Sequence, residues 1–171
     1  MASTFPWSDL LSRLMAGEDL TAAEARAAMN EVMEGTSTPA QTSAFIVALR
    51  LKGESVEEMT GLVEGMYDAA ETVSIEGPIL DIVGTGGDQS GTFNISTTAA
   101  FVVAGHGVKV AKHGTRAASS KSGSADVLMA LGGNLDLNTE QVAEWVAEVG
   151  IGFLYAINHH PAMRDASGPR R

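Results

Sequence analysis

The sequence predicts an α/β fold class in two parts, a helical N-terminal domain and a domain of parallel strands that alternate with helices. Over residues 1–75, apolar residues recur at spacings of three and four, which is the period of an amphipathic helix. After the Gly77-Pro78 pair, short apolar runs end in glycine-rich loops and alternate with helical stretches. We therefore expect a helical domain over 1–75 and an α/β domain over 76–171, with the boundary inside residues 72–78.

Four helices are predicted in the first domain. Each begins at a residue whose side chain can accept a hydrogen bond from the free amides of a first turn: Ser8, Thr21, Thr38 and Ser55. Thr21 and Ser55 are each followed three residues later by glutamate, which is the spacing of a capping box. Pro39 suits the first position of the third helix, and Gly53 marks its end. The tryptophans and methionines are interpreted as core residues.

The second domain is predicted to contain six elements. In order they are a buried strand over 79–83, a helix over 96–104, a strand over 108–112, a helix over 125–131, a helix capped by Asn138 or Thr139, and a strand over 151–155. Right-handed crossovers would make these strands parallel. The glycine-rich loops after the first two strands then lie at the carboxyl ends of the strands, where open α/β sheets bind ligands.

The charge pattern indicates where an anion would bind. Residues 89–125 contain no Asp or Glu and four cations, in a chain of net charge −10: Lys109, Lys112, Arg116 and Lys121. Thirteen of the 21 acids lie in residues 1–76 and are interpreted as a solvated acidic face. The acidic balance argues against general nucleic-acid binding but permits a small anionic ligand in a local pocket.

Other classes are excluded by composition. The chain has no cysteine, which rules out disulfides, thiolate nucleophiles and cysteine-based zinc sites and agrees with a cytoplasmic protein. It has no apolar run of the length that spans a membrane and no N-terminal signal pattern, so we expect no membrane association.

Three polar motifs lie in or beside the acid-free stretch. The first, GTGGD at residues 84–88, follows the first predicted strand, but it has Gln89 where a Rossmann motif has its third glycine, and it lacks the Lys-Ser/Thr pair of a P-loop. By itself it fits a tight turn as well as a phosphate loop. The second, NIST at residues 94–97, falls at a helix N-terminus, where free amides favour a phosphate. A simple N-cap would explain one of its polar residues.

The third motif, KHGTR at residues 112–116, ends the second predicted strand with two cations and a histidine. Small residues follow as far as Ser124 and would let a ligand approach the backbone closely. The motif fits either a solvated surface turn or an anion cradle that also contacts a second substrate. His106 and His159 are assigned no role.

These motifs, in this order and spacing, resemble the N-terminal half of the anthranilate phosphoribosyltransferase family. The resemblance runs from the helical start through DIVGTGGD (81–88), GTFNIST (91–97) and KHGTRAASS (112–120) to HPAM at residues 160–163. It implies a nucleoside phosphorylase/phosphoribosyltransferase-like fold. It also implies a glycosyltransferase of tryptophan biosynthesis that transfers the 5-phosphoribosyl group of phosphoribosyl diphosphate to anthranilate, releasing diphosphate with the help of Mg²⁺.

The resemblance also implies site residues. Those expected to bind phosphoribosyl diphosphate are Gly84, Gly87, Asp88, Thr92, Asn94, Ile95, Ser96, Thr97, Lys112, His113, Gly114, Arg116, Ala117, Ala118, Ser119, Ser120 and Ser124. Those expected to contact anthranilate are Gly84, Thr115 and Arg170. Ser96 is the expected Mg²⁺ ligand, and no catalytic acid or base is assigned.

The chain departs from the family in two respects. Thr115 stands where the family usually has asparagine, so one contact to anthranilate would be shortened or lost. The family is about twice as long, and its later half supplies an Asp-Glu pair for Mg²⁺, so we expect weak or absent activity from this chain alone. A truncated gene product, an engineered fragment and one piece of a split enzyme all fit this length. Family members commonly form homodimers through the helical domain, and the alanine-rich helices favour this here.

Two other functions stay open on the sequence. A pyrimidine nucleoside phosphorylase would share the fold and a glycine-rich phosphate loop, but its motif differs from GTGGD at residues 84–88. A noncatalytic relative that binds nucleic acid would need a basic surface, which the acidic balance disfavours.

Overall fold

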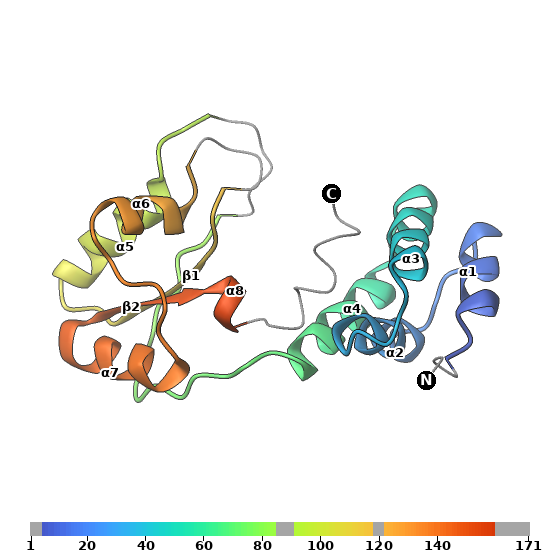
Figure 1. Ribbon diagram of the computed structural model, residues 1–171, viewed down its shortest axis with the longest axis horizontal. Helices are drawn as coiled ribbons and strands as arrows, with labels where there is room; N and C mark the ends of the chain where they lie inside the picture. The colour runs from blue at the N-terminus through green and yellow to red at the C-terminus, as the bar shows by residue number, and fades with distance from the viewer. Residues whose placement is uncertain (1–4, 85–90, 118–121, 160–171) are drawn as a thin grey trace. The chain divides into compact units, whose positions relative to one another are not determined.

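The computed structural model describes residues 5–84, 91–117 and 122–159. The described residues form two compact units, one of residues 5–70 and one of residues 71–159 (Figure 1). Within these residues, no helix combines the length and the apolar character needed to cross a membrane.

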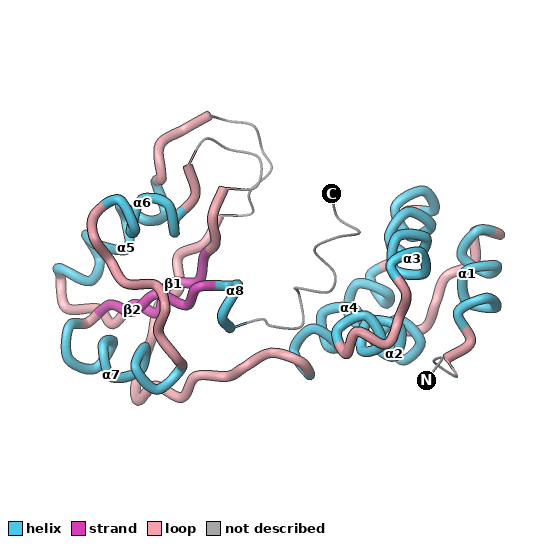
Figure 2. Tube along the Cα trace, viewed as in Figure 1, coloured by secondary structure: helices cyan, strands magenta, loops and turns pink. Residues whose placement is uncertain are grey.

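The first unit is built from helices alone (Figure 2). They are α1 (Trp7–Met15), α2 (Ala22–Met33), α3 (Pro39–Lys52) and α4 (Val56–Asp68). Thr21 with Glu24 and Ser55 with Glu58 form the predicted capping boxes. Thr38 caps α3 as predicted, with Pro39 in the first turn and the helix ending before Gly53.

The predicted start of the first helix is wrong. Ser8 lies inside α1, where its carbonyl accepts a hydrogen bond from the Ser12 hydroxyl at 2.7 Å, and the residue before the helix is Pro6. Trp7 is the first helical residue and is buried. Burial of the Trp7 ring against the core therefore decides where the helix begins, in place of a side-chain cap.

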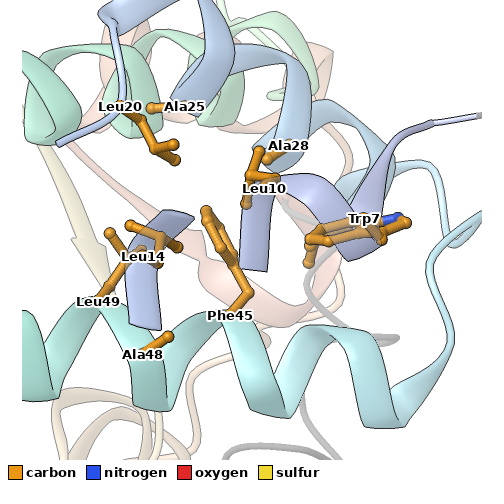
Figure 3. Close-up of a cluster of buried hydrophobic side chains, with 10 residues drawn as sticks. Trp7, Leu10, Leu14, Leu20, Ala25, Ala28, Phe45, Ala48 and Leu49 are labelled. Carbon is orange, nitrogen blue, oxygen red and sulfur yellow. The ribbon is translucent and has the colours of Figure 1, made fainter. Parts of the chain in front are cut away.

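The core of this unit lies between α1, α2 and α3. In Figure 3 the Phe45 ring of α3 points between Leu10 and Leu14 of α1. Its edge-to-face contact with Trp7 has ring centroids 5.6 Å apart and an interplanar angle of 74°. Burial of these aromatic and leucine side chains removes apolar surface from water and stabilises the unit.

Helices α2 and α4 pack backbone to backbone. A Cβ atom placed on Gly61 of α4 would lie 2.0 Å from the Ala22 carbonyl oxygen of α2, and one placed on Gly65 would lie 2.8 Å from the Met29 Cβ. The spacing of four residues puts both glycines on one face of α4. Glycine at these positions therefore permits the close approach of the two helices.

The second unit contains helices and a pair of parallel strands. In chain order its elements are α5 (Ile95–Gly105), β1 (Val110–Gly114), α6 (Ser124–Ala130), α7 (Thr139–Val149), β2 (Ile151–Tyr155) and α8 (Ala156–His159). Strands β1 and β2 are adjacent and parallel, with Val110 opposite Ile151 and Gly114 opposite Tyr155. The prediction of a parallel-stranded α/β domain after a helical domain is confirmed.

The predicted buried strand over 79–83 is wrong for the described residues. Leu80 alone pairs with β1, through an isolated parallel bridge to Val110. Ile79 and Leu80 are 37% and 39% exposed, so the apolar run lacks the two-sided burial that its composition indicated. The other predicted strands form as β1, shifted by two residues, and as β2, with the predicted bounds.

Helix α7 covers β2 through its inner face, where Val142 and Val146 are fully buried. A Cβ atom on Gly152 would lie 2.6 Å from the Val146 side chain, so this glycine allows the close contact. Trp145 stands beside this face and is 41% exposed, which contradicts its interpretation as a core residue. Met15, Met59 and Met129 are also exposed, whereas Met33 is buried as predicted.

Candidate functional site

The candidate site is centred on Lys112, which belongs to β1 and is only 2% exposed. Its ammonium group donates one hydrogen bond to the Ile82 carbonyl at 2.6 Å and one to the Ser96 hydroxyl at 3.4 Å. These two bonds join the residues before the GTGGD motif and the first turn of α5 to the middle of β1. Lys112 of the KHGTR motif therefore contacts the NIST motif through Ser96 and the stretch just before the GTGGD motif through Ile82.

Burial lowers the pKa of the Lys112 ammonium, and the nearby Asp81 carboxylate opposes this shift. Asp81 also accepts a hydrogen bond from the His113 amide at 3.2 Å, so it is tied to β1 directly. A cation that is desolvated by burial gains more from an anion than a solvated one does. The surroundings of Lys112 therefore suit a group that receives a polyanion.

Helix α5 presents its N-terminus to the same place. Asn94 is the N-cap residue, but its side chain makes no capping hydrogen bond and instead donates to the Ser122 hydroxyl at 3.4 Å. The interpretation of Asn94 as a simple side-chain cap is therefore wrong. No acidic residue lies in the first turn of α5, which leaves the positive end of the helix dipole without a counter-charge from that turn.

Thr97 in this first turn is 2% exposed, and its hydroxyl has no hydrogen-bond partner within the described part of the chain. It lines an apolar cavity of about 410 Å³ together with residues of α5, α7 and β2. Among the described residues that line this cavity, Lys112 alone is charged. The apolar cavity thus adjoins the lysine side chain and helps to keep it desolvated.

The segment after β1 turns back on itself. Gly114 ends the strand in close contact with Phe153 and Ser124, which a Cβ atom would approach to 3.0 Å. Thr115 and Arg116 are exposed, and the Arg116 guanidinium contacts the Met129 sulfur at 3.4 Å. Arg116 therefore offers a second cation on the surface beyond β1.

The expected site residues fall into two groups. Six of them lie outside the described residues: Gly87, Asp88, Ala118, Ser119, Ser120 and Arg170. Among the others, contacts in the structure connect Asn94, Ser96 and Lys112 to one region, and they bring in Asp81, Ile82 and Ser122, to which the sequence analysis gave no role. Gly84, Thr92 and Ile95 are exposed. The Thr115 carbonyl accepts a hydrogen bond from the Ala125 amide at 3.2 Å, and its exposed side chain is available to a ligand.

The described residues contain no group of three or more His, Asp or Glu side chains that could hold a metal ion. They do supply the Ser96 hydroxyl, which is a hard oxygen donor of the kind that Mg²⁺ accepts. Mg²⁺ commonly binds through one or two protein oxygens together with waters and substrate phosphates. The donor set therefore fits one protein ligand for an ion that a diphosphate carries into the site.

Two family models match the chain. Residues 8–70 match the helical bundle domain of a glycosyl transferase family, and residues 76–171 match the a/b domain of that family. The anthranilate phosphoribosyltransferase of a Nocardioides species is 54% identical over 165 residues, which are 96% of this chain and 48% of the relative. That of Anaeromyxobacter dehalogenans is 54% identical over 162 residues, again 48% of the relative.

Solved structures of anthranilate phosphoribosyltransferases are also similar to this chain. The crystal structure of anthranilate phosphoribosyltransferase from Thermus thermophilus matches with a TM-score of 0.86 and 45% identity, over 95% of this chain and 50% of the other. The enzyme from Saccharomyces cerevisiae in complex with PRPP and Mg matches with a TM-score of 0.87 and 28% identity, over 99% and 51%. The chain spans about half the length of these relatives.

Proposed function

Since this chain belongs to the glycosyl transferase family with a helical bundle domain and an a/b domain, we propose that it serves the anthranilate phosphoribosyltransferase reaction. In this reaction the 5-phosphoribosyl group of phosphoribosyl diphosphate passes to the amine of anthranilate, and diphosphate leaves. The observation that carries the proposal is the buried ammonium group of Lys112 in β1, which bonds both Ile82 and Ser96.

The chemistry of the residues supports a polyanionic substrate. Lys112 supplies a desolvated positive charge, and α5 supplies free amides at the positive end of its dipole. Asn94 and Ser96 add side-chain groups that can bond phosphate oxygens. We propose that the remaining expected residues, Gly84, Gly87, Asp88, Thr92, Ile95, Thr97, His113, Gly114, Arg116 and 117–120 with Ser124, complete the phosphate-binding surface.

The reaction asks for little acid-base chemistry. Displacement at the anomeric carbon builds oxocarbenium character in the ribose, and negative charge grows on the leaving diphosphate, where Lys112 and Arg116 stabilise it. The aromatic amine of anthranilate is already neutral at pH 7, so its alignment opposite the diphosphate matters more than its deprotonation. We propose that Gly84, Thr115 and Arg170 provide this alignment, with Arg170 pairing with the anthranilate carboxylate.

We propose that Mg²⁺ accompanies phosphoribosyl diphosphate into the site, since the Saccharomyces cerevisiae relative forms a complex with PRPP and Mg. The Ser96 hydroxyl would be the protein ligand, and bound Mg²⁺ would neutralise part of the charge on the diphosphate. Lys112 orients the Ser96 hydroxyl through its 3.4 Å hydrogen bond.

The test separates binding from turnover. We expect isothermal titration of phosphoribosyl diphosphate with Mg²⁺ to show binding to this chain, and we expect no loss of anthranilate fluorescence in the same sample. We expect binding without turnover because the match covers only 48% of one relative and 50% of another. A chain that is folded by circular dichroism and binds no phosphoribosyl diphosphate would contradict the proposal.

We propose that the protein works in the cytoplasm as a homodimer that associates through its helical domain, residues 1–75, while residues 76–171 carry the site. Support comes from apolar side chains that α3 and α4 expose, among them Val47 at 54%, Leu51 at 83% and Val56 at 85%. Such exposure favours association with another surface.

We expect light scattering to give the mass of two chains. The double variant Leu51→Glu/Val56→Glu should shift this mass toward one chain, because it places charge on the apolar surface. Met15→Glu is the control, since Met15 of α1 is similarly exposed at 74%. A mass of one chain for the unchanged protein would refute the dimer.

A further inference from the structure

Asp126, in the first turn of α6, binds two backbone amides from separate places in the chain. Its Oδ2 atom accepts a hydrogen bond from the Ala117 amide at 2.9 Å and a second one from the Gly123 amide at 2.8 Å. Ala117 and Gly123 both lie in the connection between β1, which ends at Gly114, and α6, which begins at Ser124. A single carboxylate oxygen therefore links two stretches of backbone in this connection, and we call this pair of hydrogen bonds the Asp126 clamp.

The packing at Gly123 shows how closely the two linked stretches of backbone approach each other. A Cβ atom placed there would lie 2.4 Å from the Ala117 nitrogen and 2.6 Å from the Arg116 carbonyl carbon and the Thr115 carbonyl oxygen. All three are backbone atoms, which cannot move aside as a flexible side chain can. Only glycine permits this contact, and the carboxylate of Asp126 lies where it can bridge the two stretches of backbone.

Ordinary helix capping does not account for this arrangement. A carboxylate three residues after the N-cap commonly binds the N-cap amide, and this explains the bond to Gly123. The bond to Ala117 reaches nine residues back, to a residue outside α6. This second bond holds the backbone at Ala117, and capping of α6 does not require it.

Asp126 is also the first acid after the acid-free stretch of residues 89–125. The Ala117 and Gly123 amides, with a smaller effect of Arg116, hold the pKa of its carboxyl below the usual range. The carboxylate is therefore ionised at neutral pH, and its hydrogen bonds are charge-assisted. Because the carboxylate accepts hydrogen bonds from these two amides, its charge is directed at the backbone of Ala117 and Gly123.

The residues beside the Asp126 clamp are connected to the site. Ser122, next to Gly123, accepts a hydrogen bond on its hydroxyl from the Asn94 side chain at the N-terminus of α5. At the other end, Thr115 and Arg116 follow directly after the last residue of β1. Displacing the clamp would move Arg116 and Ser122 relative to Lys112 and α5.

We propose that Asp126 is a positioning residue, which holds the backbone at Ala117 and Gly123 so that Ser122 stays bonded to Asn94 at the N-terminus of α5 and Arg116 stays close to the end of β1, in the geometry that receives a diphosphate. The inference rests on the proposed function for its ligand, but the clamp itself is a property of the free protein. In this proposal Asp126 does not contact the ligand. It holds in place other groups that contact the ligand.

The test uses Asp126→Ala, which removes both bonds, and Asp126→Asn, which keeps one oxygen acceptor and loses the charge. Glu140→Gln is the matched control, because Glu140 is an exposed carboxylate in the first turn of α7. Hydrogen exchange of the Ala117 and Gly123 amides is measured in the free protein. Titration calorimetry then gives the Kd for phosphoribosyl diphosphate with Mg²⁺.

We expect Asp126→Ala to abolish the exchange protection of the Ala117 and Gly123 amides, to leave the protection within α5 unchanged, and to raise Kd about 10- to 100-fold. Asp126→Asn should keep part of the exchange protection and should raise Kd less than Asp126→Ala does. Glu140→Gln should change neither the protection nor Kd. Gly123→Ala should raise Kd like Asp126→Ala, although it keeps the carboxylate. If Asp126→Ala does not fold, Asp126→Asn and Gly123→Ala provide the same comparison.

Three results would overturn the inference, and each is distinct. Unchanged protection in Asp126→Ala would show that there is no clamp. Lost protection with an unchanged Kd would show a clamp without a positioning role. Protection that depends on Asp126 in a protein that binds no phosphoribosyl diphosphate at all would reject the proposed function and the ligand role together, while the clamp would stand.

Discussion

Replacing Glu58 with glutamine is expected to destabilise the helical unit by about 2–4 kcal/mol, which is the usual cost of breaking a buried, hydrogen-bonded charge pair. Glu58 is fully buried and accepts hydrogen bonds from the Leu20 amide at 2.9 Å, the Ser55 amide at 2.8 Å and the Lys52 ammonium at 2.9 Å. The Lys52 side chain is itself only 6% exposed. Glutamine would leave this cation with Asp19 as its remaining carboxylate partner among the described residues.

The pH dependence follows from the same contacts. Burial by itself raises the pKa of Glu58, but the Leu20 amide, Lys52 and the Ser55 amide outweigh it and hold the pKa below the usual value. A carboxyl whose pKa is lowered on folding adds stability above its unfolded pKa and loses it as the pH falls through the folded pKa. The free energy of unfolding of Glu58→Gln should therefore decline less in acid than that of the unchanged protein.

Urea unfolding measures the loss of stability of the helical unit if Trp145, which lies in the second unit, is first replaced by phenylalanine. Fluorescence then reports on the buried Trp7 alone. Glu64→Gln is the control, because Glu64 is on the same helix, is 50% exposed and pairs with Arg26 at 3.5 Å. An exposed pair of this kind contributes less than about 1 kcal/mol. Equal losses in the two variants would show that burial of Glu58 has no special effect on stability.

Replacing Lys112 with methionine is expected to weaken the binding of phosphoribosyl diphosphate with Mg²⁺ about 10- to 100-fold, the range that follows from losing one charge-assisted interaction. Methionine fills the space of the lysine stem beside the apolar cavity but carries no charge. It also leaves the Ile82 carbonyl and the Ser96 hydroxyl without the bonds that join them. The measurement is the Kd by titration calorimetry, with circular dichroism to confirm the fold.

Lys109→Met is the matched control for this variant. Lys109 lies three residues earlier in the same acid-free stretch, and its ammonium donates to the Glu76 carbonyl at 3.2 Å, away from the site contacts of Lys112. We expect its Kd to stay within about threefold of the unchanged protein, since a distant solvated charge is screened. An equal loss in both variants would indicate general attraction between positive charge and the ligand and would reject the specific role of Lys112.

Some features of the structure were predictable because they depend on residues close together in the chain. The capping box of Thr21 with Glu24 spans three residues, so its pattern is legible in the sequence, and the helix begins where the pattern places it. Strand β2 follows Gly150, whose left-handed conformation ends α7, and its apolar run has the predicted bounds. Local hydrogen bonding and burial agree in both cases.

Predictions failed where local pattern and distant packing disagree. Ser8 has the chemistry of a cap, but the burial of Trp7 places it inside α1. The run 79–83 has the composition of a buried strand, but only Leu80 finds a partner in the described residues. Trp145 is apolar enough for the core, but it lies beside the inner face of α7 formed by Val142 and Val146 and stays partly exposed.

The sequence by itself determined the order of the four N-terminal helices and of α5, β1, α6, α7 and β2, together with the acid-free stretch and the motifs that point to an anion, because each of these is a property of neighbouring residues. Only the tertiary structure decided that Lys112 is a buried cation bound to Ile82 and Ser96, which lie 30 and 16 residues away. It alone showed that Asp126 holds Ala117 as well as its own helix start. The physical reason is that burial and long-range hydrogen bonds depend on which segments the fold brings together, and sequence spacing does not record this.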